Sequence, residues 1–118
     1  AYEIYQCDWS SDVCSSDLQL AEYDSEYEGE YKKHHDVFWI NGTNYHRKLS
    51  AVVQLSDPND YEGGDLRLYN QNETIDADAI RQQGTVVMFP SFIEHQAEKV
   101  TKGKRYSLAA WWDGPCWR

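Results

Sequence analysis

The sequence has no long apolar run, and it has few basic residues. No segment approaches the roughly 18 consecutive apolar residues that a membrane-spanning helix needs, and no charged stretch followed by an apolar one opens the chain as a secretory leader would. With 11 Lys and Arg against 20 Asp and Glu, the formal net charge is −9. Because nucleic-acid binders neutralise phosphates with Lys and Arg, this balance argues against a nucleic-acid partner. We expect neither a membrane nor a nucleic acid as a partner.

Cysteine is also scarce. The three cysteines, Cys7, Cys14 and Cys116, cannot all pair, and their wide spacing is not that of a disulfide framework. Disulfides persist in oxidising compartments and are rare in the cytosol. We therefore predict a reducing, cytoplasmic location.

The 118 residues suffice for one domain with a modest core. The chain begins with Ala1 rather than Met, and we expect a fragment, truncated at its N-terminus. Short extended runs separated by turn signals predict an all-β sandwich or barrel with no long helix. A polar turn is expected at 101–104 and a single helical turn at 74–82. The predicted strands are 19–23, 31–40, 49–56, 65–69, 85–89, 95–100 and 105–112.

His34 and Asp36 lie two residues apart in a predicted strand. Side chains alternate between the two faces of a strand, so both point the same way and can offer adjacent ligands to one metal ion. His95, which begins a later predicted strand, is the candidate for a third ligand. Two histidines and one carboxylate form the facial triad of non-heme Fe(II) oxygenases, although the same set can hold zinc with a water.

Arg105 follows His95 by ten residues and leads an apolar strand. An unpaired charge that points inward from such a strand is costly, so a buried Arg105 asks for an anionic partner. Strand alternation places Ser107 on the same face, together with Ala109 and Trp111. A guanidinium beside a hydroxyl suits a carboxylate, which arginine grips through two parallel hydrogen bonds.

Three stretches in this order resemble the 2-oxoglutarate- and Fe(II)-dependent oxygenases, and most closely their prolyl-4-hydroxylase-like branch with its bacterial and phage members. They are YKKHHD (31–36), RKLSAVVQLSDPNDYEGGDLRLY (47–69) and GTVVMFPSFIEHQAEKVTKGKRYSL (84–108). The resemblance covers roughly 19–118. It implies a double-stranded β-helix, a cupin-like jelly-roll whose two sheets enclose a metal, with 19–118 as the catalytic core.

The resemblance also implies roles for individual residues. His34, Asp36 and His95 would be the iron ligands, and Arg105 would bind the distal carboxylate of 2-oxoglutarate. Further co-substrate contacts are expected from Ser107 and from Tyr23, which lies near a position where relatives place a tyrosine. Gln54 departs from the pattern, because some relatives have a tyrosine at that strand position.

The implied activity is hydroxylation of an unactivated C–H bond, with dioxygen as oxidant and release of succinate and CO2. The implied cofactors are Fe(II) and 2-oxoglutarate, with ascorbate as a further one. The leading substrate is a peptidyl prolyl residue, and a free amino acid is the other. Two alternatives stay open: a cupin-type metal protein that does not use 2-oxoglutarate, and a truncated, non-catalytic remnant with one bare apolar sheet face.

The stretch CDWSSDVCSSDL (7–18) fits none of these roles. It lacks the second pair of ligands that a tetrahedral zinc site needs. Its middle resembles the translation of a sequencing-library adapter. We therefore predict that 1–18 is a non-native or disordered lead-in, and that 7–18 was read from adapter DNA. Without the three aspartates of this stretch, the net charge of the chain moves from −9 to −6.

Overall fold

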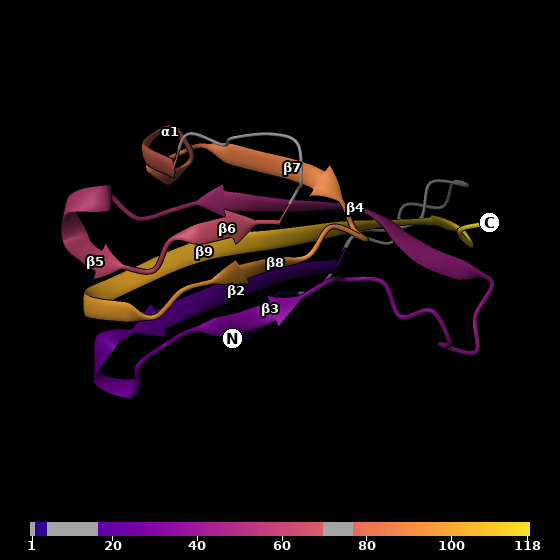
Figure 1. Cartoon of the computed structure of the whole chain (residues 1–118), viewed down its shortest axis with the longest axis horizontal. Helices are drawn as coiled ribbons and strands as arrows, with labels where there is room; N and C mark the ends of the chain where they lie inside the picture. Colours follow the sequence, from indigo (N-terminus) through magenta and orange to yellow (C-terminus); the bar gives the residue numbers. More distant parts are fainter. Residues whose placement is uncertain (1, 5–16, 70–76) are drawn as a thin grey trace.

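Two antiparallel sheets face each other in the computed structural model, which describes residues 2–4, 17–69 and 77–118 (Figure 1). The larger sheet has the order β1 (Tyr2–Ile4), β2 (Asp17–Asp24), β9 (Val100–Pro115), β4 (Tyr45–Gln54) and β7 (Val86–Pro90), and β5 (Tyr61–Gly63) pairs with β9. The smaller sheet has the order β3 (Tyr31–His34), β8 (His95–Ala97) and β6 (Leu66–Leu68). The predicted all-β, jelly-roll class is confirmed.

Strand β9 is the central strand of the larger sheet, between β2 and β4. Its register runs from Asp17↔Trp111 to Asp24↔Lys104 against β2, and from Tyr45↔Pro115 to Gln54↔Ser107 against β4. Because side chains alternate along each strand, one face of all three strands points toward the smaller sheet. That face carries the residues of the site described below.

Helical structure is limited to three short segments among the described residues. These are the 3-10 turns η1 (Ser25–Tyr27) and η2 (Pro58–Asp60) and the helix α1 (Ala77–Arg81). The helix lies inside the predicted helical turn, whose residues 74–76 fall outside the described residues. No helix of the described segments is long and apolar enough to cross a membrane.

Several predicted boundaries are wrong, and the reason is clear for two of them. The strand predicted over 31–40 ends at His34, because the backbone N–H of Asp36 donates to the carbonyl of Ser91 (2.9 Å) and so leaves the strand ladder. The turn predicted at 101–104 lies inside β9. Strand β5 pairs with β9 there, and Gly103 allows the bend with a φ of 74°.

The predicted lead-in is described only at its ends. Tyr2–Ile4 forms β1, which pairs with β2, and β2 itself begins at Asp17. Residues 5–16, which hold most of the stretch 7–18, lie outside the described residues. The origin of that stretch therefore stays a prediction.

Apolar side chains are exposed on β4 and β7, the last two strands at one edge of the larger sheet. On β7, Val86 is 54% and Met88 56% exposed, and at β4 Leu49 is 40% exposed. Leu49 alternates along β4 with Ser50, which lines the cavity between the sheets. These exposed residues thus belong to the face that points away from the cavity.

Candidate metal centre

His34, Asp36 and His95 come together at one end of the smaller sheet. His34 ends β3 and His95 begins β8, where the two are register partners, and Asp36 follows two residues after β3. Their candidate ligand atoms all lie within 4.8 Å of one another. Nε2 of His34 is 3.3 Å and Nε2 of His95 3.5 Å from Oδ1 of Asp36. These three residues could hold one metal ion.

The backbone sets the tautomer of both histidines. Nδ1 of His34 lies 2.6 Å from the carbonyl oxygen of Lys32, and Nδ1 of His95 lies 2.9 Å from that of Ile93. A carbonyl oxygen only accepts, so each Nδ1 carries the proton and donates it. In the neutral rings, Nε2 then holds the lone pair that a metal needs.

Asp36 is held by its second carboxylate oxygen. Its Oδ2 accepts hydrogen bonds from Oγ of Ser50 at 2.6 Å and from Nε1 of Trp111 at 2.9 Å. Ser50 in turn lies 3.0 Å from Oγ of Ser91, and both serines are fully buried. Oδ1 is left to face the two imidazoles.

Electrostatics favour the ligating forms of these groups. Burial opposes ionisation of Asp36, but the contacts from His34 and Ser50 outweigh it. With the further contributions of the His95 ring and Trp111, they lower the pKa of Asp36 to about 2. Burial lowers the pKa of His95 below its usual value, which favours the neutral imidazole. An ionised carboxylate beside a neutral imidazole suits a divalent cation.

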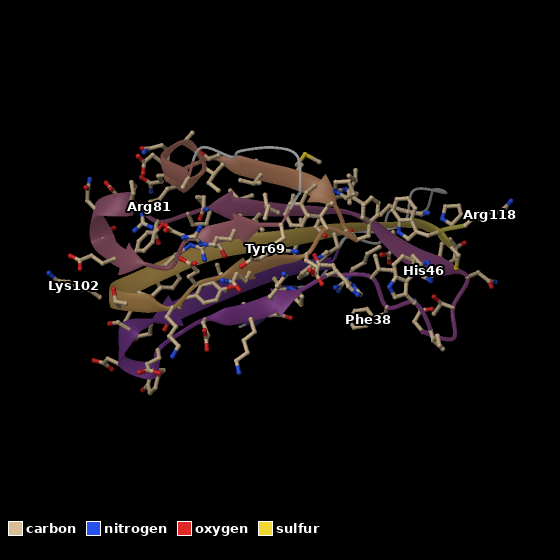
Figure 2. The ribbon with its side chains drawn as sticks, in the orientation of Figure 1. Phe38, His46, Tyr69, Arg81, Lys102 and Arg118 are labelled. Atoms are coloured by element: carbon tan, nitrogen blue, oxygen red, sulfur yellow. The ribbon has the colours of Figure 1, made fainter. Side chains whose placement is uncertain are left out.

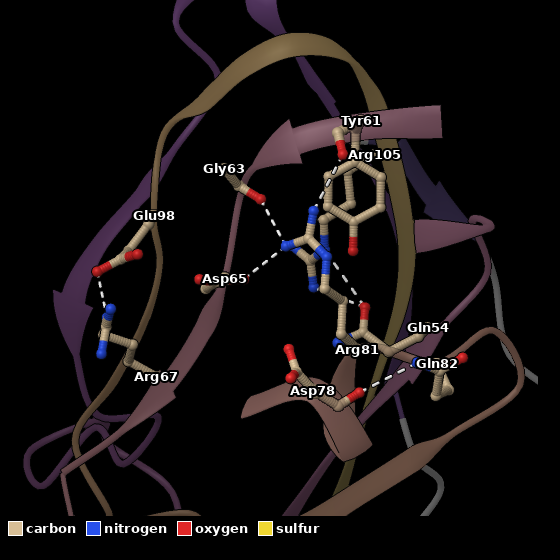
Figure 3. Close-up of polar contacts among 10 residues, drawn as sticks. All are labelled: Gln54, Tyr61, Gly63, Asp65, Arg67, Asp78, Arg81, Gln82, Glu98 and Arg105. Atoms are coloured by element: carbon tan, nitrogen blue, oxygen red, sulfur yellow. Dashed lines mark hydrogen bonds and ion pairs between the residues drawn. The ribbon is translucent and has the colours of Figure 1, made fainter. Parts of the chain in front are cut away.

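The cavity between the two sheets holds about 470 Å³ and joins this cluster to Arg105. The Arg105 side chain, on β9, is only 1% exposed. Its Nε and Nη2 donate to Oε1 of Gln54, at 3.3 and 2.9 Å, but its Nη1 is buried with no hydrogen-bond partner among the described residues (Figure 3). A buried, unpaired cationic donor is costly, so Nη1 is suited to an anionic ligand.

The structure places the other predicted co-substrate residues beside Arg105. Tyr23 is its register partner on β2, and the ring centroid lies 5.1 Å from Cζ of Arg105. Burial, opposed by Arg105, raises the pKa of Tyr23, so the phenol stays protonated. Ser107 is buried and lines the same cavity, as do Ala109 and Trp111. Strand alternation therefore predicted this face of β9 correctly.

The rim of the cavity includes a residue from the loop after β3. Phe38 lines the cavity and is 63% exposed, and it projects outward from that loop (Figure 2). The guanidinium of Arg47 lies 5.5 Å from the Phe38 ring and 4.1 Å from the Trp111 ring. The aromatic ring of Phe38 and the guanidinium of Arg47 thus line the cavity next to the three candidate metal ligands.

Sequence reasoning missed the residues that support the site. Ser50 and the indole N–H of Trp111 donate to Asp36, and Ser91 contacts Ser50 and the backbone of Asp36. Only the tertiary fold brings these groups together, and no local pattern indicates their contacts. Gln54 was singled out only as a departure from a family pattern. No signal in the sequence indicated its contact with Arg105, because the pairing of Gln54 with Ser107 is known only from the structure.

The chain belongs to the 2OG-Fe(II) oxygenase superfamily, whose family model matches residues 18–113. The predicted family resemblance is thereby confirmed. Among curated proteins, a PKHD-type hydroxylase of Prochlorococcus marinus is 38% identical over 63 residues, which are 53% of this chain and 28% of that protein. A PKHD-type hydroxylase of Nitrosomonas europaea is 39% identical over 67 residues, or 55% of this chain and 28% of that protein.

Solved structures with the same fold are also similar. A prolyl-4-hydroxylase of Pseudomonas putida matches with a TM-score of 0.64 and 22% identity, over 86% of this chain and 54% of that one. A prolyl hydroxylase of Trichoplax adhaerens, in complex with a peptide fragment of hypoxia inducible factor, gives 0.62 and 21%, over 85% and 44%. The chain thus spans between about a quarter and about half of the length of these relatives.

The residues present fit both groups in the family's name. Two imidazoles and one carboxylate are a donor set that Fe(II) accepts with positions left open. The orphaned Nη1 of Arg105, in the same cavity as that donor set, fits a carboxylate such as that of 2-oxoglutarate. The cofactors of the family are therefore Fe(II) and 2-oxoglutarate, and this chain retains groups suited to each.

Proposed function

We propose that the chain is the catalytic core of an Fe(II)- and 2-oxoglutarate-dependent dioxygenase that hydroxylates a peptidyl prolyl residue, with release of succinate and CO2. The observation that carries this proposal is the buried Nη1 of Arg105, which has no partner among the described residues and shares one cavity with the two imidazoles and the carboxylate. Such a donor suits a carboxylate ligand like that of 2-oxoglutarate.

In this proposal His34, Asp36 and His95 hold the iron. The carbonyls of Lys32 and Ile93 fix the two imidazoles through their Nδ1 protons, so that Nε2 of each ring is presented to the metal. Bound iron and 2-oxoglutarate supply the activation of dioxygen for insertion of one oxygen atom into a C–H bond. The chain's residues hold these groups and orient the reactants.

The distal carboxylate of 2-oxoglutarate is assigned to Arg105, with Ser107 and Tyr23 as further hydrogen-bond donors. Both are hydroxyl-bearing side chains on the cavity face of neighbouring strands. The protonated Tyr23 phenol can donate to an anion without adding negative charge. Arg105 contributes the positive charge, and the two hydroxyl groups orient the bound carboxylate.

The peptide substrate is inferred from the relatives. Structures similar to this chain are prolyl hydroxylases, and one of them holds a peptide fragment. The exposed Phe38 at the rim offers a surface on which a peptide could pack. The cytoplasmic location and a requirement for ascorbate remain predictions from the sequence.

Turnover of 2-oxoglutarate to succinate by the Fe(II)-loaded chain tests the proposal. We expect succinate to form with the chain and to be lost in Arg105→Ala. Prolyl peptides incubated with the chain, iron and 2-oxoglutarate should gain the mass of one oxygen atom. If the chain binds iron but Arg105→Ala leaves 2-oxoglutarate affinity unchanged, the co-substrate assignment is wrong.

A further inference from the structure

We propose that Gln54 is a positioning residue, which presents one edge of the Arg105 guanidinium to the co-substrate and thereby selects 2-keto acids with a distal carboxylate. This inference rests on the proposed function, and it concerns a residue that does not itself touch the reacting atoms. The starting observation is the contact drawn in Figure 3, where Oε1 of Gln54 accepts from two nitrogens of Arg105.

A guanidinium has two edges that can grip a planar acceptor. The side edge is formed by Nε and Nη2, and the end edge by Nη1 and Nη2. Gln54 occupies the side edge, at 3.3 Å from Nε and 2.9 Å from Nη2. The end edge remains, and its Nη1 is the buried atom without a partner in the described part of the chain. An incoming carboxylate therefore meets Arg105 end-on.

The acceptor on the side edge is the neutral amide of Gln54, so the Arg105–Gln54 pair keeps a net positive charge. Gln54 is 3% exposed and Arg105 1%, so water screens little of the guanidinium's charge. The described residues place no carboxylate against Arg105. An amide oxygen fixes the guanidinium without cancelling its positive charge, which stays available for an anionic ligand.

Neighbouring groups keep Arg105 from turning to another edge. The ring centroid of Tyr23 lies 5.1 Å from Cζ of Arg105. On another side, a Cβ added at Gly64 would stand 3.3 Å from Cδ of Arg105, so the backbone of the β5–β6 turn packs closely against its stem. With the stem of Arg105 confined in this way, the two hydrogen bonds that Arg105 donates to Oε1 of Gln54 decide the rotation of the guanidinium plane.

The consequence is selectivity for the distal group of the keto acid. A distal carboxylate pairs with the end edge of Arg105 and neutralises it. A distal amide or methyl group at the same place leaves a buried cation uncompensated, which disfavours binding. If Gln54 were a carboxylate, it would itself neutralise Arg105, and the preference for a distal carboxylate would be lost.

The test compares three ligands with the same keto-acid head: 2-oxoglutarate, 2-oxoglutaramate with a distal amide, and 2-oxopentanoate with a distal methyl. Their affinities are measured by calorimetry on the Fe(II)-loaded chain without oxygen, so no turnover is needed. The variants are Gln54→Glu and Gln54→Met. Gln82→Glu is the control, since it makes the same change at an exposed residue of the chain.

For Gln54→Glu we expect 2-oxoglutarate to bind about 30-fold more weakly or worse, while 2-oxopentanoate binds at least as tightly as to the unsubstituted chain, because Arg105 is then already neutralised. The ratio of the two affinities should thus collapse, and 2-oxoglutaramate should gain relative to 2-oxoglutarate. Gln54→Met removes the acceptor and keeps the charge of Arg105, so we expect a smaller loss of about fivefold for 2-oxoglutarate alone. Gln82→Glu should leave all three affinities unchanged.

Equal weakening of all three ligands in both Gln54 variants, or an unchanged ratio, would overturn the positioning role, because general damage to the site does not discriminate between distal groups. Iron content and circular dichroism establish that each variant is folded, and Gln54→Met decides alone if Gln54→Glu is not. If the unsubstituted chain binds iron but does not prefer 2-oxoglutarate to 2-oxopentanoate, the proposed co-substrate itself is wrong.

Discussion

The indole Nε1 of Trp111 donates a hydrogen bond to Oδ2 of Asp36, 75 residues away in sequence, at 2.9 Å. Ser50 donates to the same oxygen at 2.6 Å. With Oδ2 doubly occupied, Asp36 has only Oδ1 to offer, and Oδ1 is the atom that faces both imidazoles. A carboxylate held in this way would offer one oxygen rather than two to a bound metal.

Removal of the indole donor should therefore weaken metal binding. We expect Trp111→Phe, which keeps the aromatic ring but not the N–H, to lower Fe(II) affinity about 10-fold, the usual effect of losing an outer partner of a metal ligand. The measurement is anaerobic titration with Fe(II) against a competing chelator. Trp112→Phe is the matched control, because Trp112 neighbours it on β9 and points to the other face of the sheet. Equal affinities in the two variants would show that the hydrogen bond has no such role.

The side chain of Arg81 should contribute strongly to stability. It reaches from α1 to donate to the carbonyls of Tyr61 and Gly63 and to pair with Asp65, and its guanidinium stacks on the Tyr61 ring at 4.1 Å (Figure 3). The side chain is only 19% exposed. We expect Arg81→Ala to lower the free energy of unfolding by about 2–3 kcal/mol, because it leaves a half-buried carboxylate and two carbonyls without a donor.

Arg67 provides the control for that experiment. It pairs with Glu98, but the Arg67 side chain is 55% exposed, against 19% for Arg81. Exposed ion pairs contribute about 0–1 kcal/mol, so Arg67→Ala should change the free energy of unfolding by less than about 1 kcal/mol. Urea denaturation of both variants measures the difference. A loss in Arg67→Ala as large as in Arg81→Ala would contradict the burial argument.

The candidate metal ligands and Arg105 stand out in the sequence because their chemistry is rare in the chain. A His-x-Asp pair, one later histidine and an arginine in an apolar strand stand out by residue type and spacing alone. What supports them could not be predicted in this way. Ser50, Ser91 and Gln54 are ordinary polar residues, and only the tertiary fold brings them to their partners. Ser50 lies 14 residues from Asp36 and 41 from Ser91, and Gln54 lies 51 residues from Arg105.

The fold was predicted at the level of strands but not at every boundary. The period-2 pattern of β9 identified its cavity face from Arg105 to Trp111. It did not indicate that the strand starts at Val100, because Gly103 and the charged residues around it are typical of a turn. Tertiary pairing with β5 overrides that local signal. The apolar residues after Asp36 favour a strand locally. The backbone N–H of Asp36 instead donates to the carbonyl of Ser91, so the predicted strand does not continue there.

Gly103 should tolerate no side chain. Its φ is 74°, and a Cβ would stand 2.1 Å from the carbonyl oxygen of Asp60. Gly84 also has a positive φ, of 83°, but a Cβ there meets nothing within 4 Å. We expect Gly84→Ala to cost about 1–2 kcal/mol, from the left-handed backbone alone. Gly103→Ala should cost clearly more, because β5 must also move away from β9. Thermal unfolding of the pair tests this, and similar losses would mean that the β5–β9 pairing is not tight.

Metal binding should stabilise the fold through residues of the smaller sheet. A ligand that binds only the folded chain adds about 2.7 kcal/mol at a free concentration of 100 times its Kd. We therefore expect Fe(II), added without oxygen, to raise the melting temperature of the chain by several degrees. His95→Ala should abolish this increase, since it removes one of three ligands that come from β3, β8 and the segment between them. The control is His35→Ala. The exposed imidazole of His35 follows His34 directly but is not one of the three candidate metal ligands.

A full increase in His95→Ala would place the metal elsewhere. An increase lost in both variants would show that the exposed histidine takes part in binding.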